Sequence, residues 1–403
     1  MSNPIIENEK KFGANNYAPL PVVLVRGEGV YVWDDAGNRY LDMMSAYSAV
    51  SHGHCHPRLV KVLQEQAAKL AIVSRAFYTD KLGAFLERAC KLTGFEKALA
   101  MNTGVEAVET ALKAARKWAY SIKGVAENKA EIIACNGNFH GRTITAVGLS
   151  STPQYRKGFG PFPDGLKLIP FGDVDALEKA ITPNTAAFLV EPIQGEGGIN
   201  VPPQGYLKAC AEICKKNNVL MICDEIQTGL GRTGNLLAFQ HEGIQPDAIV
   251  LGKALGGGLL PVSLFLTRKE VMDVFMPGDH GSTFGGNPLA AAVGKAALDV
   301  LIEEHLIERA AELGKYFQEK LRTLHSPLIK EVRGRGLLIG LEIDGRYDAH
   351  EICLKLLKHG ILTKETHKTV IRFAPPLIIS KEQIDVVINA LNQVLVEAEM
   401  ELA

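Results

Sequence analysis

The sequence predicts an α/β protein in which a large domain holds a mainly parallel sheet and a smaller α+β domain follows it. Short apolar runs that end in turn residues alternate with amphipathic helical patterns, as expected when helices connect parallel strands. The chain has 403 residues, more than one ordinary core accommodates. Beyond residue 303 the pattern changes to two helices that flank a hairpin-like segment, which indicates the second domain.

The elements of the large domain can be placed in order along the chain. Residues 1–28 are predicted to be irregular, and a β-hairpin with its turn at residues 35–38 follows them. The expected helices cover about 57–70, 81–91, 106–118, 174–181 and 206–217, and another begins at Pro288. The expected strands cover 97–101, 131–136, 166–171, 186–192, 219–223, 248–251 and 261–267.

The last hundred residues are expected to form the small domain. Helices are predicted at about 303–324 and 348–359, a hairpin-like segment at 329–343, a short strand within 371–379 and a final helix at 381–397. We expect residues 1–47 to join the small domain as an N-terminal segment. The large domain is then expected to span 48–296 and the small C-terminal domain 297–403.

Composition argues against several classes of function. Apolar residues make up 47% of the chain and charged residues 22%, as in ordinary globular proteins. The formal net charge of −1 gives no reason to expect nucleic acid or an anionic membrane as a partner. No apolar run approaches the ~20 residues that span a bilayer. The N-terminus shows no secretory or transit pattern, and the seven scattered cysteines are expected to be reduced thiols in the cytoplasm.

Two groups of residues invite a metal-site interpretation. His52, His54 and His56 lie within five residues, but no carboxylate cluster accompanies them, and the spacing before Pro57 fits a loop or a helix start. Cys210 and Cys214 lie four positions apart on an expected helix, without a second Cys or His pair nearby. Structural roles are favoured for all five side chains, and we expect no metal.

Asp224 and Lys253 follow two of the expected strands, at residues 219–223 and 248–251. Ligands of open α/β sheets bind at the carboxyl ends of the strands. A lysine that can bond to an aldehyde and an acid that can pair with a pyridinium nitrogen are the groups that pyridoxal phosphate requires. Each residue also has an ordinary explanation, the aspartate as a helix cap and the lysine as a solvated surface residue.

Other segments supply groups that would complete such a site. Gly104 lies at a strand-to-helix junction, where backbone N–H groups and the helix N-terminus can bind a phosphate. Phe139 and Arg142 share a glycine-flanked loop, where the ring can stack on a cofactor and the guanidinium can bind a carboxylate. Ser282 and Thr283 can offer hydroxyls to a phosphate, although they can also cap the helix that follows.

In combination, these segments resemble the class III pyridoxal-phosphate aminotransferases of fold type I, from Asn16 to about Ile379. The motifs that carry the resemblance are VRGEGVYVWDDAGNRYLD, HGHCHP, MNTGVEAVETALKAARK, GNFHGRT, VEPIQGEGG, ICDEIQTGLGRTG, LGKALGGG, GSTFGGNPLAAA and IRFAPPL. The resemblance implies a mainly parallel seven-stranded sheet in the large domain. Within the class, Tyr17, Tyr47 and residues 103–105 resemble the ornithine aminotransferases.

The resemblance also implies how the cofactor, pyridoxal 5′-phosphate, would be held. Lys253 would bond to it covalently, Asp224 would keep its pyridine nitrogen protonated, and Gln227 would contact the ring hydroxyl. Phe139 would stack on the ring beside His140, a position where some ornithine aminotransferases carry tryptophan and other class III enzymes carry histidine. The residues implied to lie at the phosphate are Thr103, Gly104, Val105, Ser282 and Thr283, with Thr283 supplied by the neighbouring subunit of a homodimer or larger assembly.

On the substrate side, the resemblance implies that Arg142 binds a carboxylate and that Tyr17 and Tyr47 contact ornithine. We expect Glu191 to pair with Arg372 while ornithine reacts and to release it for the α-carboxylate of glutamate. The implied reaction, part of proline and arginine metabolism, transfers the δ-amino group of L-ornithine to 2-oxoglutarate and gives L-glutamate 5-semialdehyde and L-glutamate.

Three alternatives remain open at this stage. The substrate can instead be acetylornithine, 4-aminobutyrate or another ω-amine. The chain can also be a non-catalytic binding or scaffold protein that keeps the fold, a reading opposed by the filled acid, lysine and arginine positions. A nucleotide-binding protein is disfavoured because no GxGxxG or GxxxxGK[ST] pattern follows a strand.

Overall fold

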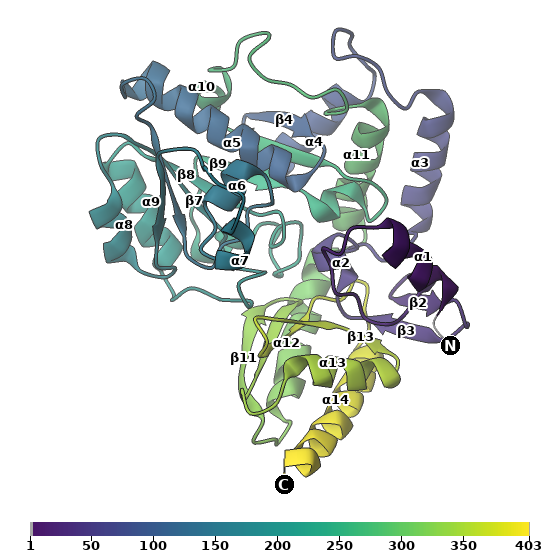
Figure 1. Cartoon of the computed structure of the whole chain (residues 1–403). Helices are drawn as coiled ribbons and strands as arrows, with labels where there is room; N and C mark the ends of the chain where they lie inside the picture. Colours follow the sequence, from purple (N-terminus) through teal and green to yellow (C-terminus); the bar gives the residue numbers. More distant parts are fainter. Residues whose placement is uncertain (1–2, 403) are drawn as a thin grey trace.

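A seven-stranded sheet forms the centre of the larger part of the molecule (Figure 1). The computed structural model describes residues 3–402. The strand order is β4 (Lys97–Met101), β10 (Ser263–Thr267), β9 (Ala248–Leu251), β8 (Leu220–Asp224), β7 (Thr185–Val190), β5 (Glu131–Cys135) and β6 (Leu166–Ile169). Strands β5 to β9 pair in parallel, whereas β10 runs antiparallel to both of its neighbours. These are the seven strands expected from the sequence, and the predicted mainly parallel sheet is confirmed.

The central strands β7, β8 and β9 are buried along their whole length because both faces of the sheet are covered. Strand β8 shows the alternation: Met221 and Cys223 belong to one core cluster, and Leu220 and Ile222 belong to another. Helix α5 (Gly104–Trp118) packs on the second cluster, and α9 (Tyr206–Lys216) packs on the first. Burial on both faces explains why these strands read as continuous apolar runs.

The remaining helices of this part begin where the sequence places start signals. Pro57 begins α3 (Pro57–Lys69) and Pro288 begins α11 (Pro288–Glu303) behind the capping side chain of Asn287. Helix α4 (Leu82–Thr93) ends at Gly94, which adopts the left-handed conformation. The shorter helices are α6 (Ile144–Gly148), α7 (Pro153–Arg156), α8 (Val174–Ala180) and α10 (Lys269–Met272).

Two four-stranded sheets build the smaller part of the molecule. One has the order β11 (Ile329–Arg335), β12 (Leu338–Ile343), β15 (Val370–Phe373), β14 (Lys364–Thr366), and it includes the expected hairpin. Helices α12 (Leu306–Arg322), α13 (Ala349–Lys358) and α14 (Lys381–Leu402) accompany it. In Figure 1 these elements lie below the large sheet, and α14 runs to the C-terminus.

The other small sheet joins the two ends of the chain. Its order is β1 (Leu24–Glu28), β2 (Tyr31–Asp34), β3 (Arg39–Asp42) and β13 (Ile361–Leu362), and β13 pairs with β3 in parallel. Strands β2 and β3 form the expected hairpin. The pairing with β13 supports an N-terminal segment that joins the small domain, and the domain limits at 47/48 and 296/297 stay a prediction.

The prediction that residues 1–28 are irregular is wrong. They contain α1 (Pro4–Phe12) and β1 (Leu24–Glu28). Asn3 caps α1 by accepting from the backbone N–H of Ile5, and Pro4 occupies the first helical position. Helix α1 buries none of its residues, so it lacks the apolar stripe by which a helix is recognised in a sequence.

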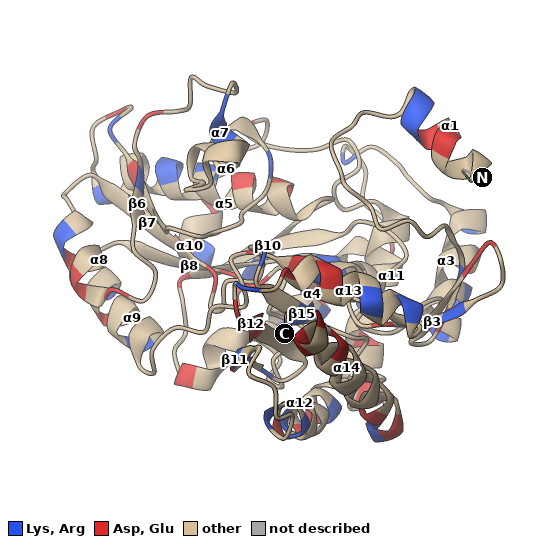
Figure 2. Cartoon of the chain, turned by 60° about the horizontal axis from the view of Figure 1, so that its bottom comes forward, with Lys and Arg blue, Asp and Glu red and all other residues tan. Residues whose placement is uncertain are grey.

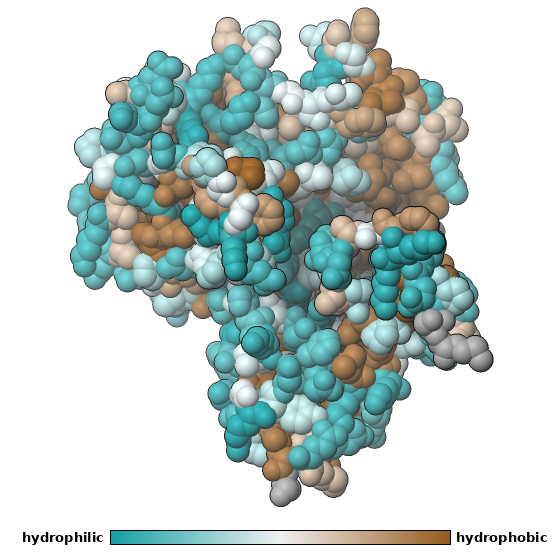
Figure 3. All heavy atoms as spheres, viewed as in Figure 1, coloured by the Kyte–Doolittle hydropathy of each residue, from teal (hydrophilic) through white to brown (hydrophobic). Residues whose placement is uncertain are grey.

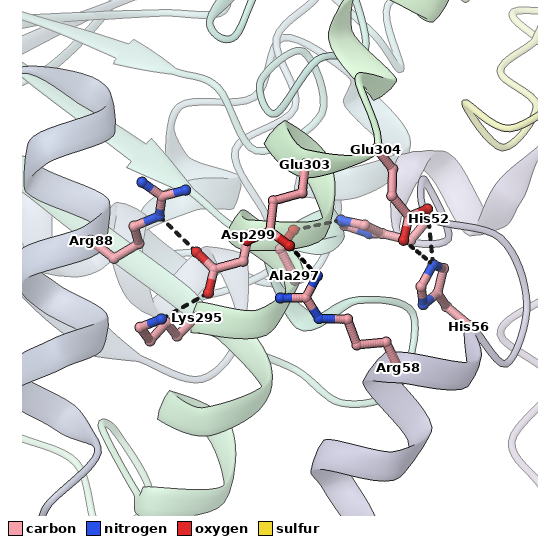
Figure 4. Close-up of polar contacts among 9 residues, drawn as sticks. All are labelled: His52, His56, Arg58, Arg88, Lys295, Ala297, Asp299, Glu303 and Glu304. Carbon is pink, nitrogen blue, oxygen red and sulfur yellow. Dashed lines mark hydrogen bonds and ion pairs between the residues drawn. The ribbon is translucent and has the colours of Figure 1, made fainter.

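The three clustered histidines each contact protein groups, and Figure 4 shows the contacts of His52 and His56. His52 Nε2 lies 2.9 Å from the carbonyl oxygen of Ala297 in α11, and His56 Nε2 lies 3.1 Å from a carboxylate oxygen of Glu304. His54 Nε2 lies 2.8 Å from Asp42 Oδ2. The first two contacts fix the segment before α3 against α11 and its C-terminal end, and the third fixes it against β3, which supports structural roles for the histidines.

The surface carries charges of both signs. Figure 2 shows basic and acidic residues mixed along α9, α13 and α14, as the net charge of −1 suggests. Among residues 3–402, no helix combines the length and the apolar character that a membrane span needs. All seven cysteines are free thiols, and Cys55 is the exposed one.

Candidate active site

A cavity of about 180 Å³ opens at the carboxyl ends of the central strands. Glu191 directly follows β7, Asp224 ends β8, and Lys253 lies two residues beyond β9, and all three line the cavity. Gly104 and Val105, which begin α5, line it from another side. Figure 3 shows the surface hollowed near its centre, between the larger upper part and the smaller parts below it. The predicted strand-end residues therefore meet in one place.

Lys253 combines an unusual backbone with a poorly solvated amine. Its φ angle is +47°, a left-handed conformation that costs a non-glycine residue about 1–3 kcal/mol. Burial lowers the pKa of Lys253, and the nearby charge of Arg372 acts in the same direction against the charges of Glu196 and Asp224. A larger fraction of the amine is therefore neutral and able to act as a nucleophile or base.

Asp224 is held by a hydrogen-bond network inside the protein. Its Oδ2 lies 2.7 Å from His140 Nδ1, and its Oδ1 accepts from the backbone N–H of Ile226 at 3.1 Å. Burial opposes the charged form of His140, but the hydrogen bond and the charge of Asp224 outweigh burial and raise the pKa of His140. The hydrogen bond therefore fixes the Asp224 carboxylate at the wall of the cavity.

Glu191 accepts two backbone hydrogen bonds. Its Oε2 accepts from the N–H of Phe139 at 3.0 Å, and its Oε1 accepts from the N–H of Gly195 at 3.3 Å. Burial raises the pKa of Glu191 to about 7, and the charge of Asp224 adds to this against the opposing charge of His140. Glu191 thus connects the loop that carries Phe139 to the turn that follows β7.

The predicted pairing of Glu191 with Arg372 is wrong. Arg372 Nη1 instead donates to Glu196 Oε1 at 2.8 Å. Glu191 directly follows its strand and is engaged by the two backbone N–H groups, whereas Glu196 lies in the turn beyond and reaches the segment that carries Arg372. Burial opposes ionisation of Glu196, but the charges of Arg372 and Lys253 outweigh it and lower the pKa of Glu196.

Tyr47 stands on a left-handed turn. The four residues Ser45–Ser48 of α2 all have positive φ angles, from 43° to 76°. This conformation costs L-residues roughly 1–2 kcal/mol each, so surrounding contacts must hold it. The Tyr47 side chain is 36% exposed, and the Arg372 guanidinium carbon lies 4.5 Å from the centre of its ring.

The carboxylate-binding candidate Arg142 is exposed and lies beside two aromatic rings. Its guanidinium carbon is 3.6 Å from the ring centre of Tyr155 and 5.3 Å from that of Phe139. Such cation–π contacts orient a guanidinium while leaving its N–H donors free. Tyr17 is 81% exposed, and the carbonyl of the next residue, Ala18, accepts from Lys364 of β14 at 3.0 Å.

The phosphate-binding candidates divide into two groups. Gly104 and Val105 supply N–H groups at the start of α5, where an α-helix leaves its first donors without intrahelical acceptors. Thr103 instead forms a capping box with Glu106. Ser282 Oγ accepts from Asn102 Nδ2 at 2.9 Å, and Thr283 is exposed.

Of the predicted residues, eight line the cavity and seven do not. Those that line it are Gly104, Val105, Phe139, His140, Glu191, Asp224, Gln227 and Lys253. Those outside its lining are Tyr17, Tyr47, Thr103, Arg142, Ser282, Thr283 and Arg372.

Known proteins resemble this chain over nearly its whole length. The family model described as Aminotransferase class-III matches residues 12–395. An ornithine aminotransferase of Brevibacillus brevis is 58% identical over 394 residues, which cover 98% of each protein. The solved structure of an ornithine aminotransferase from Toxoplasma gondii ME49 is 47% identical with a TM-score of 0.97, over 98% of this chain and 95% of that one. The chain belongs to the class III aminotransferase family, as its motifs predicted.

An acetylornithine aminotransferase from Elizabethkingia anophelis is also similar, at 50% identity and a TM-score of 0.88 over 98% of each chain. Another Toxoplasma gondii ornithine aminotransferase structure, 48% identical with a TM-score of 0.97 over 98% of this chain and 94% of that one, is described with partial occupancy of PLP at its active site. Pyridoxal 5′-phosphate is the cofactor of this family, and the predicted cofactor is therefore confirmed at the level of the family.

The cavity of this chain fits that cofactor. Two buried polar atoms of its lining residues, Gln227 Oε1 and His140 Nε2, have no hydrogen-bond partner within residues 3–402. Gly195 packs so closely on the Gln227 side chain that a Cβ there would collide with it. An amine at Lys253, an anion at Asp224 and free helix N–H groups at Gly104 and Val105 match an aldehyde, a pyridinium and a phosphate in turn.

Sequence reasoning missed three residues of this region. Glu196 stands in the VEPIQGEGG motif, but only its neighbour Glu191 follows a strand directly, which is the signal that drew attention to it. Tyr155 lies in a Gly/Pro/aromatic loop without a periodic pattern. Arg232 lies in GLGRTG, where an arginine beside glycines looks like a surface turn residue.

Proposed function

We propose that this chain is a PLP-dependent ornithine aminotransferase, which moves the δ-amino group of L-ornithine to 2-oxoglutarate and yields L-glutamate 5-semialdehyde and L-glutamate. The observation that carries the proposal is the closed ion pair between Arg372 and Glu196 beside Tyr47. An arginine left free near Lys253 would favour a carboxylate next to the reacting amine. With Glu196 bound to it, the site instead favours a substrate whose reacting amine lies far from its carboxylate.

The residues that would hold the cofactor are Lys253, Asp224, Gln227, Phe139, His140, Gly104 and Val105. When bound, pyridoxal phosphate supplies an electron sink for the negative charge that develops on the substrate carbon. Asp224, held in place by His140, would favour the protonated form of the ring nitrogen. The Lys253 amine, with its lowered pKa, is placed to take the proton from the substrate carbon.

The same site must accept two differently shaped substrates. Arg142 would bind the carboxylate of ornithine or the distal carboxylate of 2-oxoglutarate. Glu196 would release Arg372 when glutamate or 2-oxoglutarate presents its α-carboxylate near the reacting carbon. In this gate, the reversible pairing that masks Arg372, the masking carboxylate is that of Glu196 and not that of Glu191.

An acetylornithine aminotransferase is the second candidate, favoured by the similar structure from Elizabethkingia anophelis. Acetylation removes the α-ammonium charge of ornithine and leaves its δ-amine. Tyr47 and Arg372, which lie in contact, are the residues placed to distinguish the two substrates.

We also infer a homodimer whose active sites lie at the subunit interface. Thr283 is exposed and outside the cavity of its own chain, which suits a residue that reaches a neighbouring subunit. Phe77, Tyr78 and Phe284 are exposed apolar side chains that an interface would cover. We place the enzyme in the cytoplasm, where its seven free thiols would stay reduced. We assign its reaction to proline metabolism.

The proposal is tested by giving the purified holoenzyme different amino donors with 2-oxoglutarate. Ornithine, acetylornithine and 4-aminobutyrate are compared by kcat/KM, with the semialdehyde product and the cofactor absorbance followed together. Ornithine is expected to have the highest kcat/KM. A higher value for acetylornithine would identify the second candidate, and no turnover with any ω-amine would overturn both.

A further inference from the structure

Arg232 connects three segments that are distant in the sequence. Its side chain is fully buried, at 0% exposure. Nη1 donates to the carbonyl oxygens of Leu337, between β11 and β12, and Pro375, beyond β15, at 3.0 and 2.6 Å. Nη2 donates to Ser45 Oγ at 3.2 Å and to Ser51 Oγ at 3.0 Å. The guanidinium therefore contacts the small domain and the left-handed turn at the same time.

The donors of Arg232 fix the direction of both serine hydroxyls. A guanidinium has no acceptor, so each hydroxyl accepts from it and has its own proton left to donate. Ser45 Oγ donates to the carbonyl oxygen of Ala374 at 2.6 Å, and Ser51 Oγ donates to that of Ser48 at 3.0 Å. One chain of hydrogen bonds ties the turn to the segment after β15, and the other closes the turn on itself.

The charge of Arg232 has no ion-pair partner within the described residues, and its Nε has no hydrogen-bond partner there. Burial lowers the pKa of Arg232 to about 9, and the charge of Asp42 opposes this effect. A buried charge without an ion pair stabilises a fold less well than an apolar side chain of the same size. Stability alone therefore gives no reason for an arginine here, and the geometry of its four hydrogen bonds does.

Two of the segments that Arg232 joins carry Tyr47 and Arg372. Tyr47 lies inside the left-handed turn whose first residue, Ser45, is bound to Arg232. Arg372 lies two residues before Ala374, which accepts from the same serine. The contact of 4.5 Å between the Tyr47 ring and the Arg372 guanidinium spans these two segments.

We propose that Arg232 is a positioning residue for substrate selection, which sets Tyr47 against Arg372 through the hydroxyl of Ser45. The inference rests on the proposed function, because Tyr47 and Arg372 are the groups proposed to select the substrate. Arg232 itself lies outside the lining of the cavity. It holds a strained turn in an arrangement in which the Tyr47 ring packs on the Arg372 guanidinium.

The test uses Ser45→Ala, which removes the relay and keeps the buried arginine. We expect the KM for ornithine to rise by about threefold to tenfold, the effect of one lost hydrogen bond, while kcat stays within about twofold. Ser51→Ala loosens the same turn from its other end and replaces Ser45→Ala should that variant fail to fold. Thr93→Val is the matched control, because it removes a buried hydroxyl that donates to the Ala89 carbonyl in α4.

A double-mutant cycle with Tyr47→Leu separates positioning from a general loss of structure. If Ser45 acts through Tyr47, adding Ser45→Ala to Tyr47→Leu changes the KM for ornithine by less than about twofold. Equal factors in both backgrounds would overturn the proposal. A KM for Ser45→Ala and Ser51→Ala that matches that of Thr93→Val would overturn it as well.

The glutamate half-reaction keeps this test independent of the proposed substrate. The α-carboxylate of glutamate would also meet Arg372, so its KM is expected to rise in Ser45→Ala by a similar factor. Lack of ornithine turnover by the unmodified holoenzyme would overturn the proposed function. The glutamate measurements on the same variants would still decide whether Arg232 positions the site.

Discussion

The active site has two halves that are built in different ways. The cofactor half consists of Glu191, Asp224 and Lys253, which stand at the ends of adjacent strands of one sheet. The selection half consists of Tyr47, Glu196 and Arg372, which come from the N-terminal segment, a turn and the small domain. The first half is fixed by regular pairing, whereas the second depends on side-chain contacts between separate segments.

The two halves also differ in how they shift the pKa of a buried glutamate. Burial raises the pKa of Glu191 in the cofactor half, whereas the charges of Arg372 and Lys253 outweigh burial and lower the pKa of Glu196 in the selection half. The sheet edge holds its groups in a desolvated environment, and the gate holds an ion pair that can separate. A buried strand end thus suits fixed chemistry, and a pair between segments suits a change of substrate.

Replacing Lys253 by alanine tests the cofactor half and has the largest expected effect. The amine proposed to bond to the cofactor and to move the substrate proton is lost, so kcat should fall by at least about 10³-fold. The kcat of the variant is measured by semialdehyde formation from ornithine. Lys315→Ala, at a lysine whose side chain is 79% exposed, should change nothing, and activity of Lys253→Ala near that of this control would refute the assignment.

The desolvation of the sheet edge predicts a pH dependence of stability through Glu225, which follows Asp224. Glu225 Oε2 accepts from the hydroxyl of Thr228 at 2.5 Å, and Oε1 accepts from the N–H of Phe239 at 2.9 Å. Burial raises its pKa from 4.5 to about 7. The folded protein then keeps a proton that the unfolded chain loses, so this contribution to stability is complete below pH 4.5 and is lost as pH rises to about 7.

Glu225→Gln should remove about 3 kcal/mol of this pH dependence. The amide oxygen can still accept from the Phe239 N–H, and the amide nitrogen can donate to the Thr228 hydroxyl in place of the bond that this hydroxyl donates to Glu225, so both contacts keep a hydrogen bond. Urea unfolding midpoints of the holoenzyme at pH 5 and pH 8 measure the effect, with the exposed Glu319→Gln as the control. An unchanged difference between the two midpoints would mean that the sheet edge is not desolvated as described.

The selection half is tested by comparing Glu196→Ala with Glu191→Ala. Glu196→Ala frees Arg372, and the preference for the δ-amine of ornithine over an α-amine should fall by about 10- to 100-fold, as for a lost charged hydrogen bond. Glu191→Ala loosens the Phe139 loop and should lower kcat with both donors without changing their ratio. A change of the ratio in Glu191→Ala alone would restore the pairing that the structure contradicts.

The smallest expected effect concerns Tyr155, which lies at the outer edge of the site. Tyr155→Leu removes the ring that orients Arg142 and keeps an apolar side chain. The KM for 2-oxoglutarate should rise by about twofold to fivefold, the size of one exposed cation–π contact. Phe162, whose ring lies 4.5 Å from the Arg156 guanidinium carbon, provides the control variant Phe162→Leu, for which no rise is expected.

Much of the fold and of the cofactor half could be predicted, because both depend on local patterns. Apolar runs identified all seven strands of the large sheet, and the one or two residues that follow three of these runs identified Glu191, Asp224 and Lys253. Parallel strands bring their carboxyl ends to one edge, so residues distant in the sequence could be placed together without any knowledge of side-chain contacts.

The selection half could not be predicted in the same way. Residues 45–48 read Ser-Ala-Tyr-Ser, and no glycine or asparagine announces a left-handed turn. The choice between Glu191 and Glu196 depends on which side chain reaches the small domain, a distance that no local pattern contains. Helix α1 was missed because it buries no residue and leaves no periodic signal.

The parallel pairing of β3 with β13 has a consequence for the order of assembly during synthesis. Leu41 and Asp42 leave the ribosome early, but their partners Ile361 and Leu362 belong to the last part of the chain. Asp42 also accepts from the backbone N–H groups of Met44 and Ser45, at the entrance to the left-handed turn. A nascent chain can therefore complete the seven-stranded sheet, with Asp224 and Lys253 in place, while the turn proposed to select the substrate waits for the C-terminal residues to emerge.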